Sequence, residues 1–217
     1  MKHLLDYRHI IWDWNGTLLN DFLLCVECLN EQLKLLNLPP CTPEHYREIF
    51  EFPLINVYRN LGVPVDDPMR FNKICVDFMN AYEQKRHNCH LHDGARRFIH
   101  KVHEMGLGQS IFSAYSHERL APVLAEYDLN LYFSCLSGAN DLSGNKISRG
   151  PAHLRELGYD RSQVLYVGDT THDIEAAKLM GVDCAVIYHG DLAQMSLPRV
   201  SNHGVPVIEH YEDLLSL

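Results

Sequence analysis

The chain has 217 residues, of which 46% are hydrophobic and 22% charged, a composition typical of globular rather than disordered or fibrous proteins. Its 19 basic and 28 acidic residues give a net charge of −9 at pH 7. A nucleic acid partner is not expected, because binding to a phosphate backbone requires a basic surface. No run of residues approaches the ~20 apolar positions of a membrane span.

The N-terminal residues and the cysteines indicate a cellular location. Residues 1–9 are polar and carry no apolar signal core. The seven cysteines are odd in number and irregularly spaced, as expected for reduced thiols rather than disulfides. We therefore expect a cytoplasmic protein with no membrane partner. The oligomeric state is not readable from the sequence.

The predicted elements begin with a short buried strand at residues 9–12, followed by a polar turn that starts at Asp13. From residue 20 to 88 the apolar spacing is helical, interrupted by proline-rich breaks. Strands and helices then alternate. The pattern predicts strands at 109–113, 132–136, 164–167 and 184–187, and helices at 95–105, 119–127, 152–157, 174–180 and 211–215.

This order of elements predicts an α/β fold. Alternating strands and helices are typical of a Rossmann-like parallel sheet covered by helices on both faces. The all-helical stretch interrupts that pattern after the first strand. We therefore expect one α/β core, residues 1–19 and 93–217, with a helical cap inserted at residues 20–92.

Polar residues stand where the predicted strands end, which is where open parallel sheets carry their sites. Asp13 follows the first strand, Ser113 ends the second, and Lys146 lies in a later loop. Asp169 and Asp173 follow the strand at 164–167. Carboxylates gathered at one edge would repel one another without a cation between them, and hard oxygen ligands suit Mg²⁺. A lysine and a hydroxyl beside Mg²⁺ suit a phosphoryl group.

Four motifs in this order resemble those of the haloacid dehalogenase-like hydrolases, and within them the phosphoglycolate-phosphatase-like branch with a helical cap. They are Asp13-Trp14-Asn15-Gly16-Thr17, Ser113-Ala114, Lys146, and Gly168-Asp169-Thr170-Thr171-His172-Asp173. The resemblance covers essentially the whole chain. It implies a Mg²⁺-dependent phosphatase of small phosphorylated metabolites.

The resemblance also implies roles for individual residues. Asp13 would attack phosphorus and become an aspartyl phosphate. Mg²⁺ would be bound by Asp13, Asp169 and the backbone carbonyl of Asn15, with Asp173 as a further ligand or as an acceptor behind the ligands.

Four other residues would complete the site. The Ser113 hydroxyl and the backbone N–H of Ala114 would bind the phosphoryl group, and Lys146 would neutralise the nucleophile and the phosphate. Thr17 would steady the loop after the first strand. Arg47, in the cap, would bind a carboxylate or a second phosphate of the substrate, although a solvated helix arginine fits the sequence equally well.

Asn15 departs from the family pattern. The related phosphatases have a second aspartate at this position, which protonates the leaving oxygen and then activates water. An amide does neither at neutral pH, and general acid–base catalysis contributes roughly 10²–10⁴-fold. The sequence therefore predicts phosphate and Mg²⁺ binding with slow hydrolysis.

Several alternatives remain open at this position. His172 would substitute for the missing acid, or the substrate would be a phosphonate or an activated phosphate that needs none. Alternatively, the protein would be a catalytically weak binder of phosphorylated metabolites. Deamidation of Asn15, next to a flexible Gly16, would create the missing aspartate. Carbon–halogen cleavage is disfavoured, because it needs no metal and leaves Asp169 and Asp173 without a role.

Overall fold

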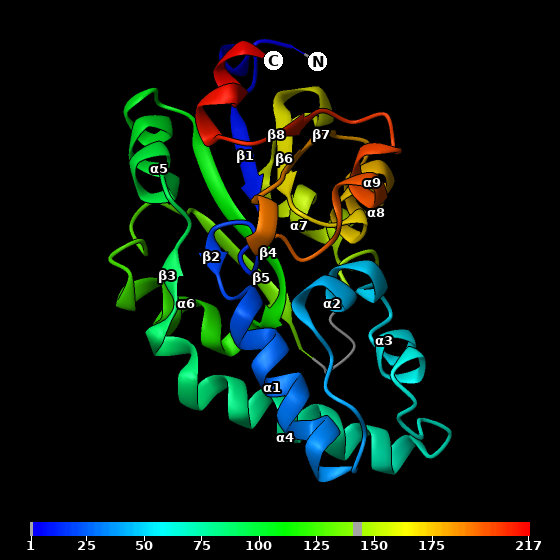
Figure 1. Ribbon diagram of the computed structural model, residues 1–217. Helices are drawn as coiled ribbons and strands as arrows, with labels where there is room; N and C mark the ends of the chain where they lie inside the picture. Colours follow the sequence, from blue (N-terminus) through cyan, green and yellow to red (C-terminus); the bar gives the residue numbers. More distant parts are fainter. Residues whose placement is uncertain (1, 141–144) are drawn as a thin grey trace.

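The computed structural model describes residues 2–140 and 145–217 (Figure 1). A six-stranded parallel sheet has the order β5-β4-β1-β6-β7-β8. Its strands are β1 (His9–Trp12), β4 (Gly108–Ser116), β5 (Cys135–Ala139), β6 (Val164–Gly168), β7 (Asp183–Ile187) and β8 (Val207–Ile208). The predicted α/β class with a Rossmann-like sheet is confirmed.

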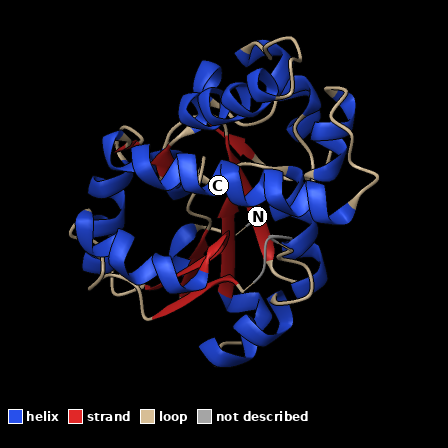
Figure 2. Cartoon of the chain, turned by 90° about the horizontal axis from the view of Figure 1, so that it is seen from below, coloured by secondary structure: helices blue, strands red, loops and turns tan. Residues whose placement is uncertain are grey.

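Helices cover both faces of this sheet (Figure 2). The helices of the core are α5 (Ala95–Glu104), α6 (His117–Glu126), α7 (Gly150–Leu157), α8 (Thr171–Met180) and α9 (Leu197–Ser201). Short 3₁₀ turns lie at η1 (Leu4–Asp6), η3 (Arg161–Gln163), η4 (Gly190–Leu192) and η5 (Tyr211–Ser216). None of the described helices is long and apolar enough to cross a membrane.

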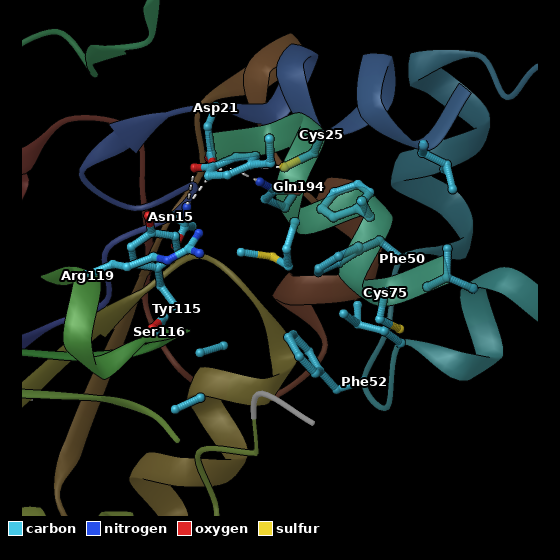
Figure 3. Close-up of a pocket in the computed structure, with 18 of the residues that line it drawn as sticks. Asn15, Asp21, Cys25, Phe50, Phe52, Cys75, Tyr115, Ser116, Arg119 and Gln194 are labelled. Atoms are coloured by element: carbon cyan, nitrogen blue, oxygen red, sulfur yellow. Dashed lines mark hydrogen bonds between the residues drawn. The ribbon is translucent and has the colours of Figure 1, made fainter. Parts of the chain in front are cut away.

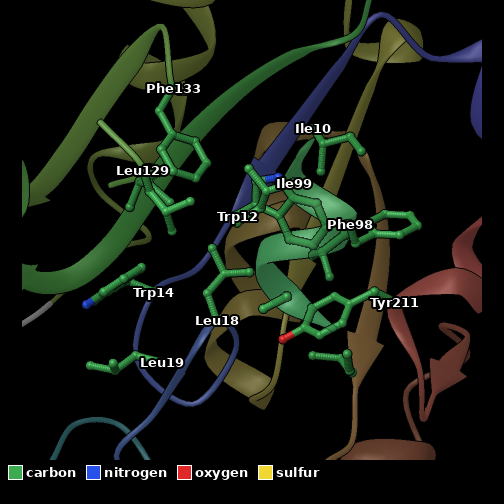
Figure 4. Packing of buried hydrophobic residues seen from close by; sticks show 14 of the residues in the cluster. Ile10, Trp12, Trp14, Leu18, Leu19, Phe98, Ile99, Leu129, Phe133 and Tyr211 are labelled. Carbon is green, nitrogen blue, oxygen red and sulfur yellow. The ribbon is translucent and has the colours of Figure 1, made fainter. Parts of the chain in front are cut away.

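The side chains of β1 alternate between two hydrophobic clusters, as the period of a strand requires. Trp12 packs with Phe98 of α5 and Tyr211 of η5 on one face (Figure 4). Ile11 points to the other face, where Ile174 of α8 belongs to its cluster. A central strand buried on both sides explains the run of apolar residues that precedes Asp13.

The helical insertion lies between two short strands, β2 (Leu19–Asn20) and β3 (His90–Leu91), which pair antiparallel. We call the helices between them the cap: α1 (Phe22–Leu35), α2 (Pro43–Ile49), α3 (Ile55–Asn60), α4 (Pro68–Lys85) and the turn η2 (Arg86–Asn88). In Figure 1 they lie together at the end of the sheet opposite the two termini. The boundary of the cap near residues 20 and 92 stays a prediction.

Two predicted strands have different bounds in the structure. The strand expected at 132–136 lies at Cys135–Ala139, because Tyr132 belongs to a turn and stacks on His100, with 4.5 Å between the ring centroids. The strand expected to end at residue 113 continues to Ser116 through an irregularity in its pairing with β5. Ser113 therefore lies inside β4 and not at its end.

Candidate active site

The loops after β1 and β6 leave the sheet side by side. Trp12 is in register with Val167, and the backbone N–H of Asp13 donates to the carbonyl of Val167 at 2.9 Å. The carboxyl-bearing residues that follow the two strands are therefore brought to one edge. Asp13 comes directly after β1, and Asp169 directly after β6.

Lys146 bridges two of the carboxylates at this edge. Its Nζ atom lies 2.7 Å from Asp13 Oδ1 and 2.6 Å from Asp173 Oδ1, and all three side chains are almost fully buried. Burial disfavours the lysine charge, but the two carboxylates outweigh that effect and raise the Lys146 pKa. An ammonium group is thus held against the side chain expected to be the nucleophile.

Asp173 is the most firmly anchored of the carboxylates. Its Oδ2 accepts hydrogen bonds from the Thr170 hydroxyl at 2.7 Å and from the backbone N–H groups of Thr170 and Asp169 at 3.0 and 3.2 Å. Burial alone would raise its pKa, but Lys146 and these donors lower it to about 2. Asp173 also lies in the first turn of α8, where the helix dipole favours a negative charge.

Asp169 leaves one oxygen without a partner. Its Oδ1 accepts a hydrogen bond from Thr17 Oγ1 at 2.9 Å, whereas the buried Oδ2 has no hydrogen-bond partner among the described residues. Burial raises the pKa of Asp169 well above its usual range, and the charges of Asp173 and Asp13 add to this effect. Thr17 therefore contacts Asp169, and a contact of Thr17 with the substrate stays a prediction.

The donor set fits a divalent cation. Carboxylate oxygens of Asp13, Asp169 and Asp173 lie within 4.8 Å of one another, and Lys146 balances only one of the three negative charges. The unpartnered Oδ2 of Asp169 points to the same need. Gly16 makes room beside it: its φ is +74°, and a Cβ there would collide with Asp169 Oδ2.

Ser113 and Ala114 lie on β4 beside this edge. Ser113 is buried, and its Oγ accepts a hydrogen bond from the backbone N–H of Tyr115 at 3.1 Å, which keeps the hydroxyl proton for another acceptor. Ala114 lines a large cavity between the core and the cap. Phosphoryl binding by this pair stays a prediction.

Asn15 is held by a buried carboxylate that sequence reasoning did not single out. Its amide Nδ2 donates to Asp21 Oδ2 at 2.6 Å and to the Tyr82 hydroxyl at 2.8 Å, and that hydroxyl donates to Asp21 Oδ2 at 2.7 Å (Figure 3). Asp21 has no exposed surface, and burial raises its pKa. An acidic residue directly before an apolar helix was the signal for it in the sequence.

Two proposed replacements for the missing acid do not fit the geometry. The ring of His172 stacks on Phe52 of the cap with 4.1 Å between centroids, and burial lowers its pKa to about 4, which disfavours the imidazolium form that would act as the acid. The backbone N–H of Gly16, which would have to attack the Asn15 amide for deamidation, donates to Leu19 O at 2.9 Å and to Asp21 Oδ1 at 3.1 Å.

Arg47 lies away from the site. Its Nη1 donates to the backbone carbonyl of Asp191 at 2.5 Å, and its guanidinium carbon lies 5.5 Å from the centre of the Phe22 ring. These contacts join the cap to the η4 segment of the core. The structure gives Arg47 a role in cap–core contact in place of the expected substrate contact.

Comparison with known proteins identifies the family. The family model for haloacid dehalogenase-like hydrolases matches residues 10–187, so the chain belongs to this family. A phosphoglycolate phosphatase of Pseudomonas savastanoi pv. phaseolicola is 30% identical over 149 residues, 67% of this chain and 50% of the relative. The chain thus spans about half the length of that relative. One from Pseudomonas fluorescens strain Pf0-1 is 26% identical over 217 residues, 96% of this chain and 75% of the relative.

Solved structures share the fold over nearly the full chain. A predicted phosphatase from Clostridium acetobutylicum superposes with a TM-score of 0.83 at 14% identity, covering 97% of each chain. Protein Tyrosine Kinase A of Mycobacterium tuberculosis gives a TM-score of 0.77 at 19% identity, covering 97% of this chain and 99% of the other. Since proteins named for different activities share this fold, the function must be argued from the site.

Proposed function

We propose that this chain is a Mg²⁺-dependent hydrolase of small phosphomonoesters that acts through an aspartyl phosphate on Asp13. The observation that carries the proposal is the pairing of Asp13 with the buried Lys146, beside Asp169 and Asp173. The similarity to phosphoglycolate phosphatases supports the same reaction class.

Mg²⁺ would be held by carboxylate oxygens of Asp13 and Asp169 and by the backbone carbonyl of Asn15, with Asp173 behind them. When bound, it would neutralise charge between the nucleophile and the phosphoryl oxygens. The fit rests on the excess of negative charge and on the unpartnered Asp169 Oδ2.

The residues of the chain account for both half-reactions. A carboxylate oxygen of Asp13 attacks phosphorus, and the ester P–O bond breaks with its electron pair going to the leaving alcohol oxygen. Burial raises the Asp13 pKa to about 7, and the charge of Lys146 opposes that rise and favours the ionised nucleophile. The Ser113 hydroxyl and the Ala114 N–H bind phosphoryl oxygens. Water then attacks phosphorus, and the bond to Asp13 breaks to restore the carboxylate. Solvent supplies the proton that the leaving alcohol oxygen gains and accepts the proton that the attacking water loses.

Asn15 makes both half-reactions slow in this account. In the related phosphatases the aspartate at this position protonates the leaving oxygen and activates the attacking water. The amide of Asn15 would do neither. Losing that help costs roughly 10²–10⁴ in rate. The second candidate function, a weakly catalytic binder of a phosphorylated metabolite, is favoured by one observation: the Asn15 amide is fixed by Asp21 and Tyr82.

The test is phosphate release from a panel of small phosphomonoesters, 2-phosphoglycolate included, with Mg²⁺ and with a chelator. We expect turnover by the wild type that the chelator abolishes and that Asp13→Asn lowers by at least about 10³-fold. Asp66→Asn, an exposed carboxylate outside the site, is the matched control and should not change the rate. Turnover that survives in Asp13→Asn would exclude the proposed nucleophile, and an absence of turnover with retained phosphate binding would favour the binder.

A further inference from the structure

A large cavity opens from the candidate active site into the cap. Its volume is about 640 Å³, within the ~300–1,000 Å³ of pockets that bury ligands of drug size. Asn15 and Ala114 line its core end; Asn15 is two positions after Asp13, and Ala114 directly follows Ser113. A phosphoryl group held by the core would therefore direct the rest of its ester into this cavity.

The cap wall of the cavity is apolar. Its aromatic members are Tyr46, Phe50, Phe52, Tyr58, Phe78 and Tyr82. Tyr46 stacks on Phe50 with centroids 5.3 Å apart, and Phe50 meets Phe52 edge to face at 5.7 Å. Figure 3 shows Phe50 and Phe52 across the cavity from Asn15 and Tyr115. The wall offers mainly ring faces and edges, with the hydroxyl groups of its tyrosines as its few polar atoms.

The charges on the cavity wall disfavour a carboxylate on the alcohol part of the substrate. Arg119 is the one cation among the described residues that line it; Glu83 Oε1, 3.0 Å from its Nη1, offsets its charge, although that nitrogen makes no hydrogen bond to a described residue. Asp21 and Glu118 line the same cavity and would repel a carboxylate. A carboxylate taken out of water without a cationic partner is strongly disfavoured. A two-carbon acid such as glycolate would also leave most of the apolar wall in contact with water.

We propose that the substrate is a phosphate monoester whose alcohol carries an aromatic ring, rather than a small carboxylated phosphate such as 2-phosphoglycolate. This inference rests on the proposed function of the same site and names its substrate class. The phosphoryl group would lie against Ser113, Ala114 and Lys146, and the ring would lie among the aromatic residues of the cap.

The test compares benzyl phosphate with 2-phosphoglycolate in the presence of Mg²⁺. Both have ordinary alcohols as leaving groups, so a difference in rate does not reflect an activated phosphate. We expect kcat/KM for benzyl phosphate to exceed that for 2-phosphoglycolate by about 100-fold, since apolar complementarity is worth roughly 10–200-fold for each small group. A preference for 2-phosphoglycolate would overturn the inference.

Two lysine variants test whether the cavity wall sets the preference for benzyl phosphate over 2-phosphoglycolate. Met79 of α4 lines the cavity, and Met79→Lys places a cation there with an unbranched side chain of similar length. It should lower kcat/KM for benzyl phosphate and raise it for 2-phosphoglycolate, so that their ratio falls at least tenfold. Met69→Lys, on the same helix but 84% exposed, is the matched control and should leave the ratio unchanged. An unchanged ratio in Met79→Lys would contradict the proposal.

A binding measurement separates this inference from the proposed reaction. If neither ester turns over, hydrolysis is wrong for this chain. The non-hydrolysable analogues 2-phenylethylphosphonate and 3-phosphonopropionate then decide on the ligand class by calorimetry with the wild type and Mg²⁺. Tighter binding of the phenyl compound supports the inference without the reaction. Equal, weaker or absent binding of that compound overturns it.

Discussion

Asn15 has an amide where the related phosphatases have a carboxylate. The buried carboxylate of Asp21, at the start of the cap, lies against that amide. Asp21 precedes α1, and Tyr82 of α4 shares its hydrogen bonds, so the amide of Asn15 is tied to two cap helices. The carboxyl group is one residue position away from the apolar start of α1 and has no exposed surface. Its hydrogen-bond donors, which also include the Gly16 N–H and the Gln194 amide, are all neutral.

Exchanging these two side chains tests what position 15 contributes. In Asn15→Asp alone, two carboxylates would face each other across 2.6 Å, so we expect a less stable protein than the double variant Asn15→Asp/Asp21→Asn. The double variant keeps one amide and one carboxyl in contact and puts the carboxyl at the reacting centre. We expect its kcat for an alkyl phosphate to rise by about 10²-fold, measured by phosphate release.

The single variant Asp21→Asn is the control for the exchange, because it changes the second position without supplying an acid. It should not gain activity. If the double variant folds, binds Mg²⁺ and is no faster than the wild type, position 15 does not limit the reaction.

A second residue-scale prediction concerns buried histidine. His9 lies in β1 with no exposed surface, and burial lowers its pKa from 6.5 to about 4. The folded state keeps the ring neutral, whereas the unfolded chain takes up a proton below pH 6.5, so stability is lost as pH falls from 6.5 to 4.

The His9→Gln variant removes that titration. Relative to this variant, the wild type should lose about 3 kcal/mol of unfolding free energy between pH 7 and pH 4, measured by urea unfolding. Parallel pH profiles for the two proteins would show that burial does not hold His9 neutral.

At the scale of elements, the cap is fastened to the core through the C-terminal end of α2. Arg199 of α9 donates from Nη1 to the backbone carbonyls of Phe50 at 2.6 Å and Glu48 at 2.9 Å. These carbonyls end a helix, where a cation is favoured by the helix dipole. The same chain segment contains Phe50 and Phe52 of the cavity wall. The Arg199 hydrogen bonds therefore also help to position that wall.

Replacing this cation should loosen the cap locally. In Arg199→Met we expect faster proteolytic cleavage near residues 47–53 and a higher KM for phosphomonoesters, with kcat changed by less than about threefold. The measurements are limited proteolysis with peptide mapping, and steady-state kinetics. An unchanged cleavage pattern would show that the cap is held elsewhere.

The sequence predicted the elements well where one pattern dominated. β1 and β6 are runs of apolar residues closed by Asp13 and Gly168, and their bounds were found to within one residue. The strand predicted from Tyr132 was displaced, because that aromatic ring packs on His100 outside the sheet. Periodicity does not distinguish an aromatic ring packed in a turn from one in a strand.

The candidate site was predictable in part for the same reason. Asp13, Lys146, Asp169 and Asp173 stand beyond strand ends, and the parallel sheet brings such positions together. Asp21 was not singled out, because its importance comes from folding the cap back onto the core. Arg47 was predicted to contact the substrate or to be solvated, and its contact with the backbone of Asp191, 144 positions away in the sequence, could not be read from the sequence.

For the whole molecule, the structure joins an α/β core suited to phosphoryl transfer with an apolar cap cavity. One of the two hydrophobic clusters contains buried side chains of both parts, from Ile11 and Ile174 in the core to Phe50 and Tyr58 in the cap. Asn15 and Ala114 line the cavity and lie close in sequence to Asp13 and Ser113 of the candidate site. The central claim is that Asp13 carries the phosphoryl group between substrate and water.

The most direct measurement of that claim is rapid-quench kinetics with p-nitrophenyl phosphate and Mg²⁺, followed by mass spectrometry of the quenched protein. The p-nitrophenolate departs without an acid, whereas hydrolysis of the aspartyl phosphate still lacks a base at Asn15. We predict a burst of p-nitrophenol equal to the enzyme concentration, a slow steady state, and one phosphoryl group on the peptide that contains Asp13. A phosphoryl group on another residue, or an undiminished burst in Asp13→Asn, would contradict the account.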